Sequence, residues 1–468
     1  MSLYEIFKQH PVITTDSRNC PCGSIFFALK GEMFDGNQYA LSALEKGCSY
    51  AVVEKGNLPQ TSPLGEGLKD RLIFVDSPLT ALQDLAREHR RALGTTIIGV
   101  TGTNGKTTTK ELIATVLSRK FKTLYTQGNF NNHIGVPKTL LSLTPDHEIA
   151  VVEMGANHPG EIKTLVNIVE PDYGIITNVG KAHLEGFGSF EGVIRTKGEL
   201  YDFLRSSSGS SGSSSSSGSS SSSSSSCSKG SSSSSGSQAN SQQPTANSLP
   251  TGVFINENNP HLMGISSGLN LVKYGKNGRL ISSDPFLRLE FEGREIQTRL
   301  IGAYNIDNAL AAATIGQYFG VPVDDICAAL EEYTPSNNRS QFKKTEKNSL
   351  IIDAYNANPT SMMAALENFA AMKAERKMCI LGAMRELGEA SAEEHQRVLD
   401  YLDAHFSDLW LVGEEWKSVN HPIDDVPCLL FNDIDAVKSF LTSHPQHDKT
   451  ILIKGSNSTH LIDIVPML

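Results

Sequence analysis

The sequence predicts an α/β protein of three domains, in which a central parallel sheet of the P-loop ATPase type is followed by a C-terminal Rossmann-like, doubly wound sheet. Three observations lead to this prediction. With 468 residues, the chain is too long for one ordinary hydrophobic core. A glycine-rich loop joins a strand-like run to a helix-like run at 95–120. Strand-like and helix-like stretches then alternate, and the alternation starts again near residue 335.

The first predicted domain covers residues 1–93. A strand-like run, a helical run and a second strand-like run predict a small α/β unit, at 24–31, 39–47 and 49–55. Asp16-Ser17-Arg18 and Lys30-Gly31 lie at element ends, where an arginine and backbone N–H groups can bind a diphosphate. Taken alone, the first of these segments is explained more simply as a solvated turn.

The second predicted domain, residues 94–334, opens with the glycine-rich loop. Gly102 and Gly105 let the backbone curl with its N–H groups pointing inward, and a helix that begins close to Thr107 adds the positive end of its dipole. Lys106 contributes a mobile ammonium group, and the Thr107 hydroxyl can hold Mg²⁺. The loop therefore predicts a polyphosphate site.

The loop departs from the general P-loop pattern in one respect. That pattern places its first glycine six positions before the lysine, where this chain has Val100. A glycine-rich turn with no ligand is the alternative, but it leaves Lys106 and the two threonines after it unexplained.

Two further strand-like runs of this domain, 148–154 and 173–178, end in polar residues where a parallel sheet exposes its carboxyl edge. Glu153 and, shortly after the second run, His183 can bind the metal that bridges nucleotide phosphates. A structural role is the alternative for His183. Lys197 follows in a helical stretch; a metal would repel its ammonium form, whereas a carbamate formed with CO₂ would be a metal ligand.

The composition changes abruptly at about 206–250, where nearly every residue is Ser with some Gly, Gln, Asn and Pro. Such a segment has too few apolar side chains to offset its ordering entropy, so we expect it to be disordered. A helix predicted to end near Arg205 precedes it and a strand-like run at 252–256 follows it. The tract is therefore expected to be an insertion within the second domain.

The rest of the second domain combines strand-like runs with an alanine-rich helix at 308–319. Asn305 and Asn308 are one helical turn apart, so their amides can face one ligand, with helix capping by Asn305 as the alternative.

The third predicted domain covers residues 335–468. Strand-like runs recur between helical stretches, at 350–354, 378–381, 408–412 and 450–454, which is typical of a doubly wound parallel sheet. The ends of its strands carry Asp353, Tyr355, Asn356, Asn358 and Lys454. Ligand-binding groups belong at these ends.

Composition limits the classes of function. A net charge of −10 argues against nucleic acid as the main partner. No apolar run approaches the roughly 18 residues of a membrane span, and the N-terminus lacks the pattern of a secretory signal, so we expect a cytoplasmic protein. Seven scattered cysteines suit a reducing compartment.

Several separated stretches together resemble the Mur ligases. The most telling are TDSR, GVTGTNGKTTTKE, VVEMGANHPGEI, NVGKAHLEGFGS, RLIGAYNIDNALAAA, DAYNANPTSMMAAL, LGAMRELGE and ILIKGS. The resemblance spans all three predicted domains and leaves mainly the Ser-rich tract unmatched. YNANP together with LGxMxELG favours the branch of this family that joins D-alanyl-D-alanine to UDP-N-acetylmuramoyl-tripeptide.

The resemblance implies roles for particular residues. Those expected to cradle ATP phosphates are Gly102, Thr103, Asn104, Gly105, Lys106, Thr107 and Thr108, and the other ATP contacts are Asn305, Asn308, Arg339 and Asp353. Thr107, Glu153, His183 and a carbamylated Lys197 would hold Mg²⁺. Ser17, Arg18, Lys30 and Gly31 would meet the UDP-sugar, and Asn356, Asn358 and Lys454 the peptide or dipeptide. We place Lys106, His183, Lys197 and Asn356 among the catalytic residues.

The implied reaction is ATP-dependent amide formation in peptidoglycan synthesis, which serves cell shape and division. ATP would phosphorylate the tripeptide carboxylate, and the dipeptide amine would then displace phosphate. We expect a monomer in which closure of the domains about hinges near 93 and 334 excludes water.

Three residues depart from the family pattern: Tyr304 replaces a usual His, Ala383 a usual Asp, and Asn457 a common Arg. The alternatives are another Mur-type ligase, a folylpolyglutamate-type synthetase, or a nucleotide-binding scaffold that has lost catalysis.

Overall fold

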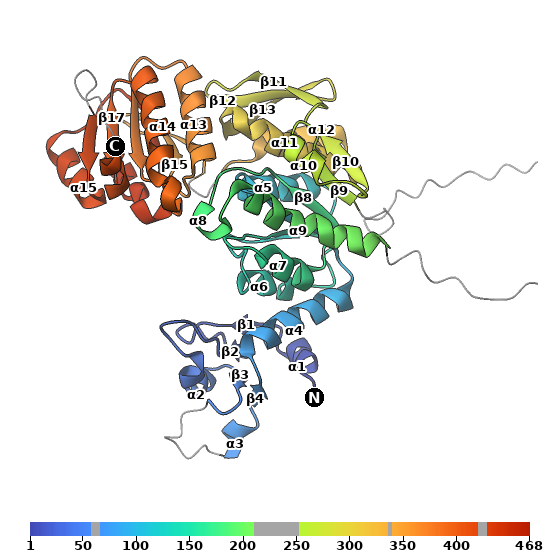
Figure 1. Cartoon of the computed structure of the whole chain (residues 1–468). Helices are drawn as coiled ribbons and strands as arrows, with labels where there is room; N and C mark the ends of the chain where they lie inside the picture. The colour runs from blue at the N-terminus through green and yellow to red at the C-terminus, as the bar shows by residue number, and fades with distance from the viewer. Residues whose placement is uncertain (58–65, 210–251, 336–338, 420–427) are drawn as a thin grey trace, which may run out of the picture.

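The computed structural model describes residues 1–57, 66–209, 252–335, 339–419 and 428–468 (Figure 1). Within these ranges the chain forms four β-sheets, three of them built mainly from parallel strands with helices packed on them. The multi-domain α/β class is therefore confirmed. In the described part of the chain, no helix is long and apolar enough to cross a membrane.

The first sheet has the order β1-β2-β3-β4, and all its strands are parallel. Its elements are α1 (Leu3–Gln9), β1 (Ile13–Thr14), β2 (Ile25–Phe27), α2 (Ala40–Glu45), β3 (Tyr50–Glu54), α3 (Glu66–Lys69), β4 (Leu72–Val75) and α4 (Pro78–Leu93). The apolar side chains of β2 and the central ones of β3 are buried and form the centre of this small unit.

Helix α4 connects the first sheet to the next one. Ser77 caps its N-terminus and Gly94, at φ +65°, ends it. The helix is bound to the central unit over much of its length: Gln83 donates to the carbonyl of His133, and Arg90 pairs with Asp172 at 3.0 Å. A hinge at residue 93 would place α4 with the first unit, so movement about it would have to break these contacts.

The central sheet has six parallel strands in the order β10-β9-β8-β5-β7-β6. They are β5 (Thr96–Thr101), β6 (Thr123–Tyr125), β7 (Ile149–Glu153), β8 (Tyr173–Ile176), β9 (Gly252–Asn256) and β10 (Leu271–Tyr274). The helices between them are α5 (Lys106–Leu117), α6 (Gly135–Leu141), α7 (Glu161–Val169), α8 (Leu184–Phe187), α9 (Phe190–Gly209) and α10 (Pro260–Gly264).

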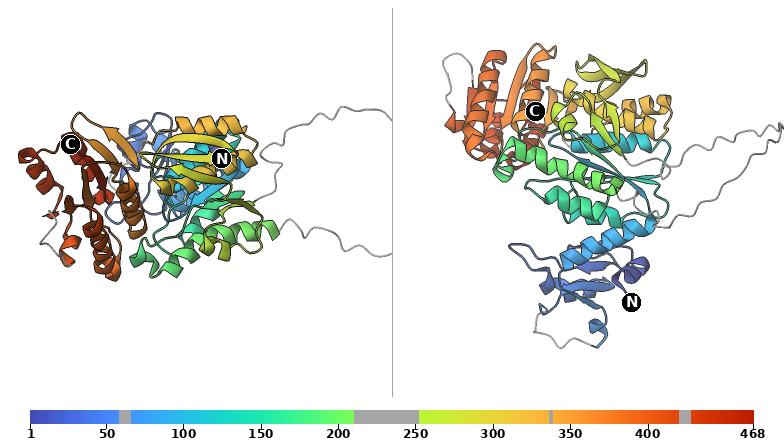
Figure 2. Two further views of the ribbon diagram at one scale, coloured as in Figure 1. Left: turned by 90° about the horizontal axis from the view of Figure 1, so that it is seen from above. Right: turned by 45° about the vertical axis from the view of Figure 1, so that its right-hand side comes forward.

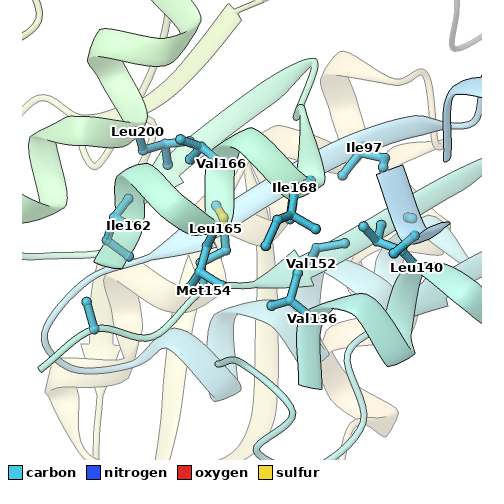
Figure 3. Packing of buried hydrophobic residues seen from close by; sticks show 14 of the residues in the cluster. Ile97, Val136, Leu140, Val152, Met154, Ile162, Leu165, Val166, Ile168 and Leu200 are labelled. Atoms are coloured by element: carbon cyan, nitrogen blue, oxygen red, sulfur yellow. The ribbon is translucent and has the colours of Figure 1, made fainter. Parts of the chain in front are cut away.

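Each face of this sheet carries its own core. Ile97 of β5 packs with α6, α7 and α9, where Leu165 and Val166 meet Val152 and Met154 (Figure 3). The next residue, Ile98, faces the opposite core under α5 and α11 (Ile306–Tyr318). This alternation follows from the pleat of a strand that is covered on both sides.

An antiparallel hairpin sheet completes this part of the chain. It consists of β11 (Gly278–Ser282), β12 (Phe286–Phe291) and β13 (Arg294–Ile301), followed by α11 (Ile306–Tyr318) and α12 (Val323–Glu332).

The C-terminal sheet has the order β14-β15-β19-β16-β17-β18, parallel except for the edge strand β14. Its strands are β14 (Gln341–Lys344), β15 (Ser349–Asp353), β16 (Lys377–Gly382), β17 (Leu409–Val412), β18 (Cys428–Phe431) and β19 (Thr450–Lys454). Helices α13 (Pro359–Ala371) and α14 (Ser391–His405) cover one face, and α15 (Ile434–Ser443) covers the other. The doubly wound arrangement is confirmed.

The first and the C-terminal sheet units lie at different positions around the central one (Figure 2). The unit of β1–β4 lies below the central sheet in Figure 1, and the C-terminal unit lies beside α8 at the upper left.

Helix α9 differs from its predicted end. It continues to Gly209 rather than stopping near Arg205, because the Ser206 and Ser207 hydroxyls donate to the carbonyl of Phe203 and keep the last turn hydrogen-bonded. The rest of the predicted disordered tract lies outside the described residues. Since α9 runs between the parallel neighbours β8 and β9, the tract interrupts a crossover connection of the central sheet.

Candidate active site

One cavity of about 1170 Å³ lies between the carboxyl edge of the central sheet and the C-terminal unit. Leu79 and Gln83 of α4 also contribute to its wall. Most of the residues predicted for the site line it: Thr103, Asn104, Gly105, Lys106, Thr108, Glu153, His183, Asn305, Asn308, Arg339, Asp353, Asn356, Asn358 and Lys454.

The loop between β5 and α5 has the curled backbone expected of a phosphate loop. Gly102 has φ +143° and Gly105 has φ +76°, a region that disfavours side chains. A Cβ at Gly102 would come within 2.0 Å of the Thr177 hydroxyl, and one at Gly105 within 2.6 Å of the Asn308 amide. Both glycines are therefore required by conformation and by close approach.

Lys106, the first residue of α5, folds back over this loop. Its Nζ donates to the carbonyls of Gly102 at 2.8 Å and Thr103 at 3.0 Å. Burial lowers the pKa of Lys106 to about 8; Glu153 opposes this shift and Arg339 adds to it. A polyphosphate in the loop would supply the negative charge that this amine lacks.

Glu153 ends β7 beside α5. Its Oε1 accepts from the Thr107 hydroxyl at 3.3 Å and from the Asn131 amide at 2.8 Å. Its Oε2 is buried and has no hydrogen-bond partner among the described residues, although Lys110 Nζ lies 3.8 Å away. A buried carboxylate oxygen of this kind fits a bound cation.

The donor set also fits Mg²⁺ rather than a metal with an all-protein cage. Across the described ranges, no three His, Cys, Asp or Glu side chains converge as a metal cluster. Nucleotide-bound Mg²⁺ takes only one or two carboxylates and relies on phosphates and water for the remainder. Thr107 and Glu153 supply a hydroxyl and a carboxylate of that type.

His183 lies at the start of α8, with φ +50°. Its Nδ1 is hydrogen-bonded to Oε2 of Glu386, which belongs to the C-terminal unit. Burial lowers the pKa of His183 while Glu386 raises it, and the lower value prevails. A neutral imidazole is the form that can bind a metal.

Lys197 of α9 is buried, with a side chain only 2% exposed. Its Nζ donates to the carbonyl of Ala156 at 3.1 Å and lies 5.1 Å from the centre of the Phe187 ring. Burial holds the pKa of Lys197 well below its usual range, and the Lys106 charge adds to this effect. The structure thus favours a neutral amine, which is the form that reacts with CO₂.

Asn305 and Asn308 are joined to each other rather than presented as two free amides. Asn308 Nδ2 donates to Asn305 Oδ1 at 2.8 Å, and Asn305 Nδ2 donates to the carbonyl of Ile301 at 2.7 Å. The Thr109 hydroxyl donates to Asn308 Oδ1 at 3.0 Å. The alternative of a helix cap by the Asn305 side chain is not found.

The C-terminal unit contributes groups from its strand ends. Lys454 Nζ donates to Asp353 Oδ2 at 2.6 Å and to the carbonyl of Asn356 at 3.2 Å, because β15 and β19 are neighbours in register. The Arg339 guanidinium lies 3.9 Å from the centre of the Tyr355 ring.

Three further contacts join this unit to the central one. Asn358 and Asn104 exchange amide hydrogen bonds at 2.7 and 3.3 Å. Lys181 pairs with Glu394 at 2.5 Å, and the backbone N–H of Lys181 donates to the Thr360 hydroxyl at 3.2 Å.

The predicted UDP-sugar residues lie in the first unit and are not among the residues that line the cavity. Arg18 is exposed and forms an ion pair with Asp16, and Ser17 accepts a hydrogen bond from Lys46 at 2.8 Å through its carbonyl. Lys30 and Gly31 begin a short turn in which the N–H of Gly31 donates to the carbonyl of Phe34.

Of the three departures, two line the cavity. The Tyr304 hydroxyl is hydrogen-bonded to that of Ser340 at 2.9 Å, and Asn457 donates its N–H to the carbonyl of Tyr355 at 3.1 Å. Ala383 is buried, and its carbonyl accepts from the Ser456 hydroxyl at 3.2 Å.

Sequence reasoning did not assign Lys110, Asn131 or Glu386 to the site. Glu386 belongs to the LGxMxELG stretch, which can be recognised in the sequence. The sequence does not indicate that the partner of Glu386 is His183. Lys110 reads as an ordinary helix-surface lysine, yet it is fully buried.

Three family models match the chain in succession. Residues 11–90 match the Mur ligase family catalytic domain, residues 100–210 the Mur ligase middle domain, and residues 338–457 the Mur ligase glutamate ligase domain.

Several relatives match over nearly the whole length, among them two that are at least 31% identical and are named UDP-N-acetylmuramoyl-tripeptide--D-alanyl-D-alanine ligase. The Escherichia coli (strain K12) protein is 33% identical, with 97% of this chain and 93% of the relative covered. The Haemophilus influenzae protein is 31% identical, with 97% and 92% covered.

Solved structures agree with this similarity. MurF from Acinetobacter baumannii superposes with a TM-score of 0.77 at 27% identity, with 97% of this chain and 92% of the other covered. MurF ligase from Thermotoga maritima in complex with ADP has the same fold, with a TM-score of 0.77 at 24% identity, and 100% and 98% of the two chains are covered.

Proposed function

The chain belongs to the Mur ligase family, and on that premise we propose that it joins D-alanyl-D-alanine to UDP-N-acetylmuramoyl-tripeptide in an ATP-dependent reaction. The product is the UDP-linked pentapeptide used for peptidoglycan. Relatives covered almost end to end carry this activity in their names. The same similarity does not favour a folylpolyglutamate-type synthetase or a lost catalyst.

The observation that carries the proposal is the composition of the cavity wall. A phosphate loop, a buried carboxylate and a histidine come from the central unit, while Arg339, Asp353 and Lys454 come from the C-terminal unit. A ligase that activates a carboxylate needs ATP and two substrates to meet in one place. The central and the C-terminal units each contribute cationic and acidic side chains to the wall of the cavity in which ATP and the two substrates would meet.

The reaction has two steps. The tripeptide carboxylate attacks the γ-phosphorus of ATP, so ADP leaves and an acyl phosphate forms. The amine of D-alanyl-D-alanine then attacks the acyl carbon, and the tetrahedral intermediate collapses to an amide as inorganic phosphate departs. Lys106, whose Nζ lies against the carbonyl of Gly102 in the phosphate loop, would stabilise charge on the phosphoryl oxygens in the first step.

Mg²⁺ bound here would neutralise phosphate charge. Thr107, Glu153 and His183 are the residues that would hold it, together with Lys197 if its amine carries a carbamate. Support for this assignment comes from the unpartnered Glu153 oxygen and from the low pKa of the buried Lys197 amine.

The proposal also includes the division into domains, the substrate contacts and the oligomeric state. Residues 1–93, 94–334 and 335–468 act as three domains, with Ser17, Arg18, Lys30 and Gly31 at the UDP-sugar and Asn356, Asn358 and Lys454 at the peptide. We further propose that the protein acts as a cytoplasmic monomer. Closure would bring the first unit's substrate towards the cavity.

Phosphate release from ATP tests the proposal. The protein is incubated with UDP-N-acetylmuramoyl-tripeptide, with and without D-alanyl-D-alanine, and the product is weighed by mass spectrometry. Release that depends on the dipeptide, together with a pentapeptide mass, is the expected result. Turnover with single amino acids instead of the dipeptide would assign the chain to another branch of the family.

A further inference from the structure

A carboxylate from the C-terminal unit reaches the histidine of the central unit. Glu386 Oε2 is hydrogen-bonded to Nδ1 of His183, and both side chains line the same cavity. A carboxylate that accepts the Nδ1 proton of an imidazole fixes its tautomer and leaves Nε2 with a free lone pair. The pair thus has the form in which a second residue orients a metal-binding histidine.

Both residues adopt backbone conformations that favour glycine. His183 has φ +50° and Glu386 has φ +62°. Non-glycine residues in this region are strained and persist where the surrounding structure holds them. Two such residues therefore meet in one hydrogen bond.

The loop that carries Glu386 is anchored on both sides. The N–H of Met384 donates to Nε2 of the buried His395 at 3.0 Å, and the His395 ring lies edge-on to Trp416 with centres 4.6 Å apart. Arg385 pairs with Glu415. Leu387, on the other side, is buried in the C-terminal core. The loop is therefore a fixed support rather than a free surface turn.

The opposite partner is supported as well. The His183 ring lies edge-on to the Phe187 ring, with centres 6.2 Å apart, and the backbone N–H of Glu185 donates to the carbonyl of Glu386 at 3.4 Å. The side-chain contact and the backbone contact join the same two segments.

We propose that Glu386 is a positioning residue for His183: it sets the tautomer and the direction of the imidazole, so that the metal site is complete only when the C-terminal unit is docked. The inference rests on the proposed role of His183 in metal binding. In this proposal Glu386 does not contact the metal itself. It orients the metal ligand His183 from the C-terminal sheet unit. Docking of the units and the order of the metal site are then one event.

Mn²⁺ binding to the full-length protein in the presence of ADP tests the inference. Binding is followed by electron paramagnetic resonance, and the coupling of Mn²⁺ to an imidazole nitrogen is followed by electron spin-echo spectroscopy. The variants are Glu386→Gln, Glu386→Ala, His183→Ala and the Glu386→Ala/His183→Ala double variant. Glu389→Gln, an exposed carboxylate three residues further on, is the matched control.

The expected result is a loss of Mn²⁺ affinity of about tenfold or more in Glu386→Ala, as for other residues that orient metal ligands. The nitrogen coupling weakens with it. The double variant is no worse than His183→Ala, because Glu386 acts through His183. Glu386→Gln, whose amide oxygen still accepts from Nδ1, retains affinity within a few-fold, and Glu389→Gln matches the wild type.

Three outcomes overturn the inference. Unchanged affinity and coupling in Glu386→Ala would leave Glu386 as a contact between units only. Tighter Mn²⁺ binding in that variant would mean that Glu386 masks His183. Absence of nitrogen coupling in the wild type would remove His183 from the metal site, and dipeptide-dependent phosphate release in the same preparation would show that the proposed function stands apart from this failure.

Discussion

Asn358 Nδ2 donates to Asn104 Oδ1 at 2.7 Å, so the first turn of α13 is tied directly to the phosphate loop. The same Asn358 side chain caps α13 by accepting from the N–H of Ser361 at 2.9 Å. One residue therefore stabilises a helix in one unit and contacts the nucleotide loop of another. The two roles can be separated by substitution.

Asn358→Ser should keep the cap and lose the contact with Asn104, whereas Asn358→Ala should lose both. We expect the Ala variant to be less stable by about 1 kcal/mol and the Ser variant to be close to the wild type. Both should show a lower kcat/KM for ATP. Thermal melting and steady-state kinetics on the pair check this, and a Ser variant with wild-type kinetics would remove the contact from the mechanism.

Lys106→Met should abolish most turnover without unfolding the protein. Loss of a group that stabilises transition-state charge costs about 100-fold or more in kcat. Stability should stay the same or rise, because burying the lysine charge is unfavourable, as its low pKa indicates. Phosphate release and melting curves measure the two effects. Lys163→Met, at an exposed position of α7, is the control that should leave both unchanged.

His89 should make stability depend on pH. Its Nε2–H donates to the carbonyl of Leu143 at 2.9 Å, and burial lowers its pKa below the usual value of 6.5. The unfolded chain therefore binds a proton more readily than the folded one, so stability is complete above about pH 6.5 and falls as the pH decreases. Denaturation measured between pH 8 and 5 should show a shallower fall in His89→Gln, and an equal fall would exclude this origin.

Lys181→Ala should loosen the docking of the C-terminal unit. Its ammonium pairs at 2.5 Å with Glu394, whose side chain is 3% exposed and would be left without this partner. Small-angle scattering of the free protein should show a larger radius of gyration, and Lys181→Arg should restore the wild-type value. Identical curves for all three proteins would mean that the other contacts between the units suffice.

Lys197 should carry a carbamate in buffers that contain bicarbonate. Burial lowers the pKa of its amine well below the usual range and so favours the neutral form, which is the nucleophile that adds CO₂. Labelled bicarbonate should give a carbamate carbon signal in ¹³C NMR that is absent from Lys197→Ala. A spectrum without this signal in the wild type would leave Lys197 as a buried structural amine.

The groups at the strand ends could be predicted from the sequence, because the parallel strands of one sheet end at one edge. Asp353 and Lys454 follow short apolar runs that form neighbouring strands of the C-terminal sheet, and Glu153 follows such a run in the central sheet. The sequence also indicates α4, since Leu82, Leu85, Ala86 and His89 recur on one face of a helix.

The contacts between units could not be predicted in this way. Asn104 and Asn358 are 254 residues apart, and the partner of His183 lies in a different sheet. Such pairs depend on how the surfaces of two units pack against each other. The hydrophobic periodicity of each segment does not predict that packing. The burial of Lys110 has the same cause, since it follows from what packs over α5 rather than from α5 itself.

The interruption of the crossover between α9 and β9 also bears on how the protein can be handled. A crossover helix runs opposite to its strands, so α9 ends and β9 begins at the amino edge of the central sheet, away from the cavity at the carboxyl edge. The views in Figures 1 and 2 agree, with both ends on the side opposite the C-terminal unit. A fluorescent reporter or new chain termini introduced between Gly209 and Gly252 would therefore stay clear of the chemistry, which makes this crossover the place to engineer a sensor of ligand binding.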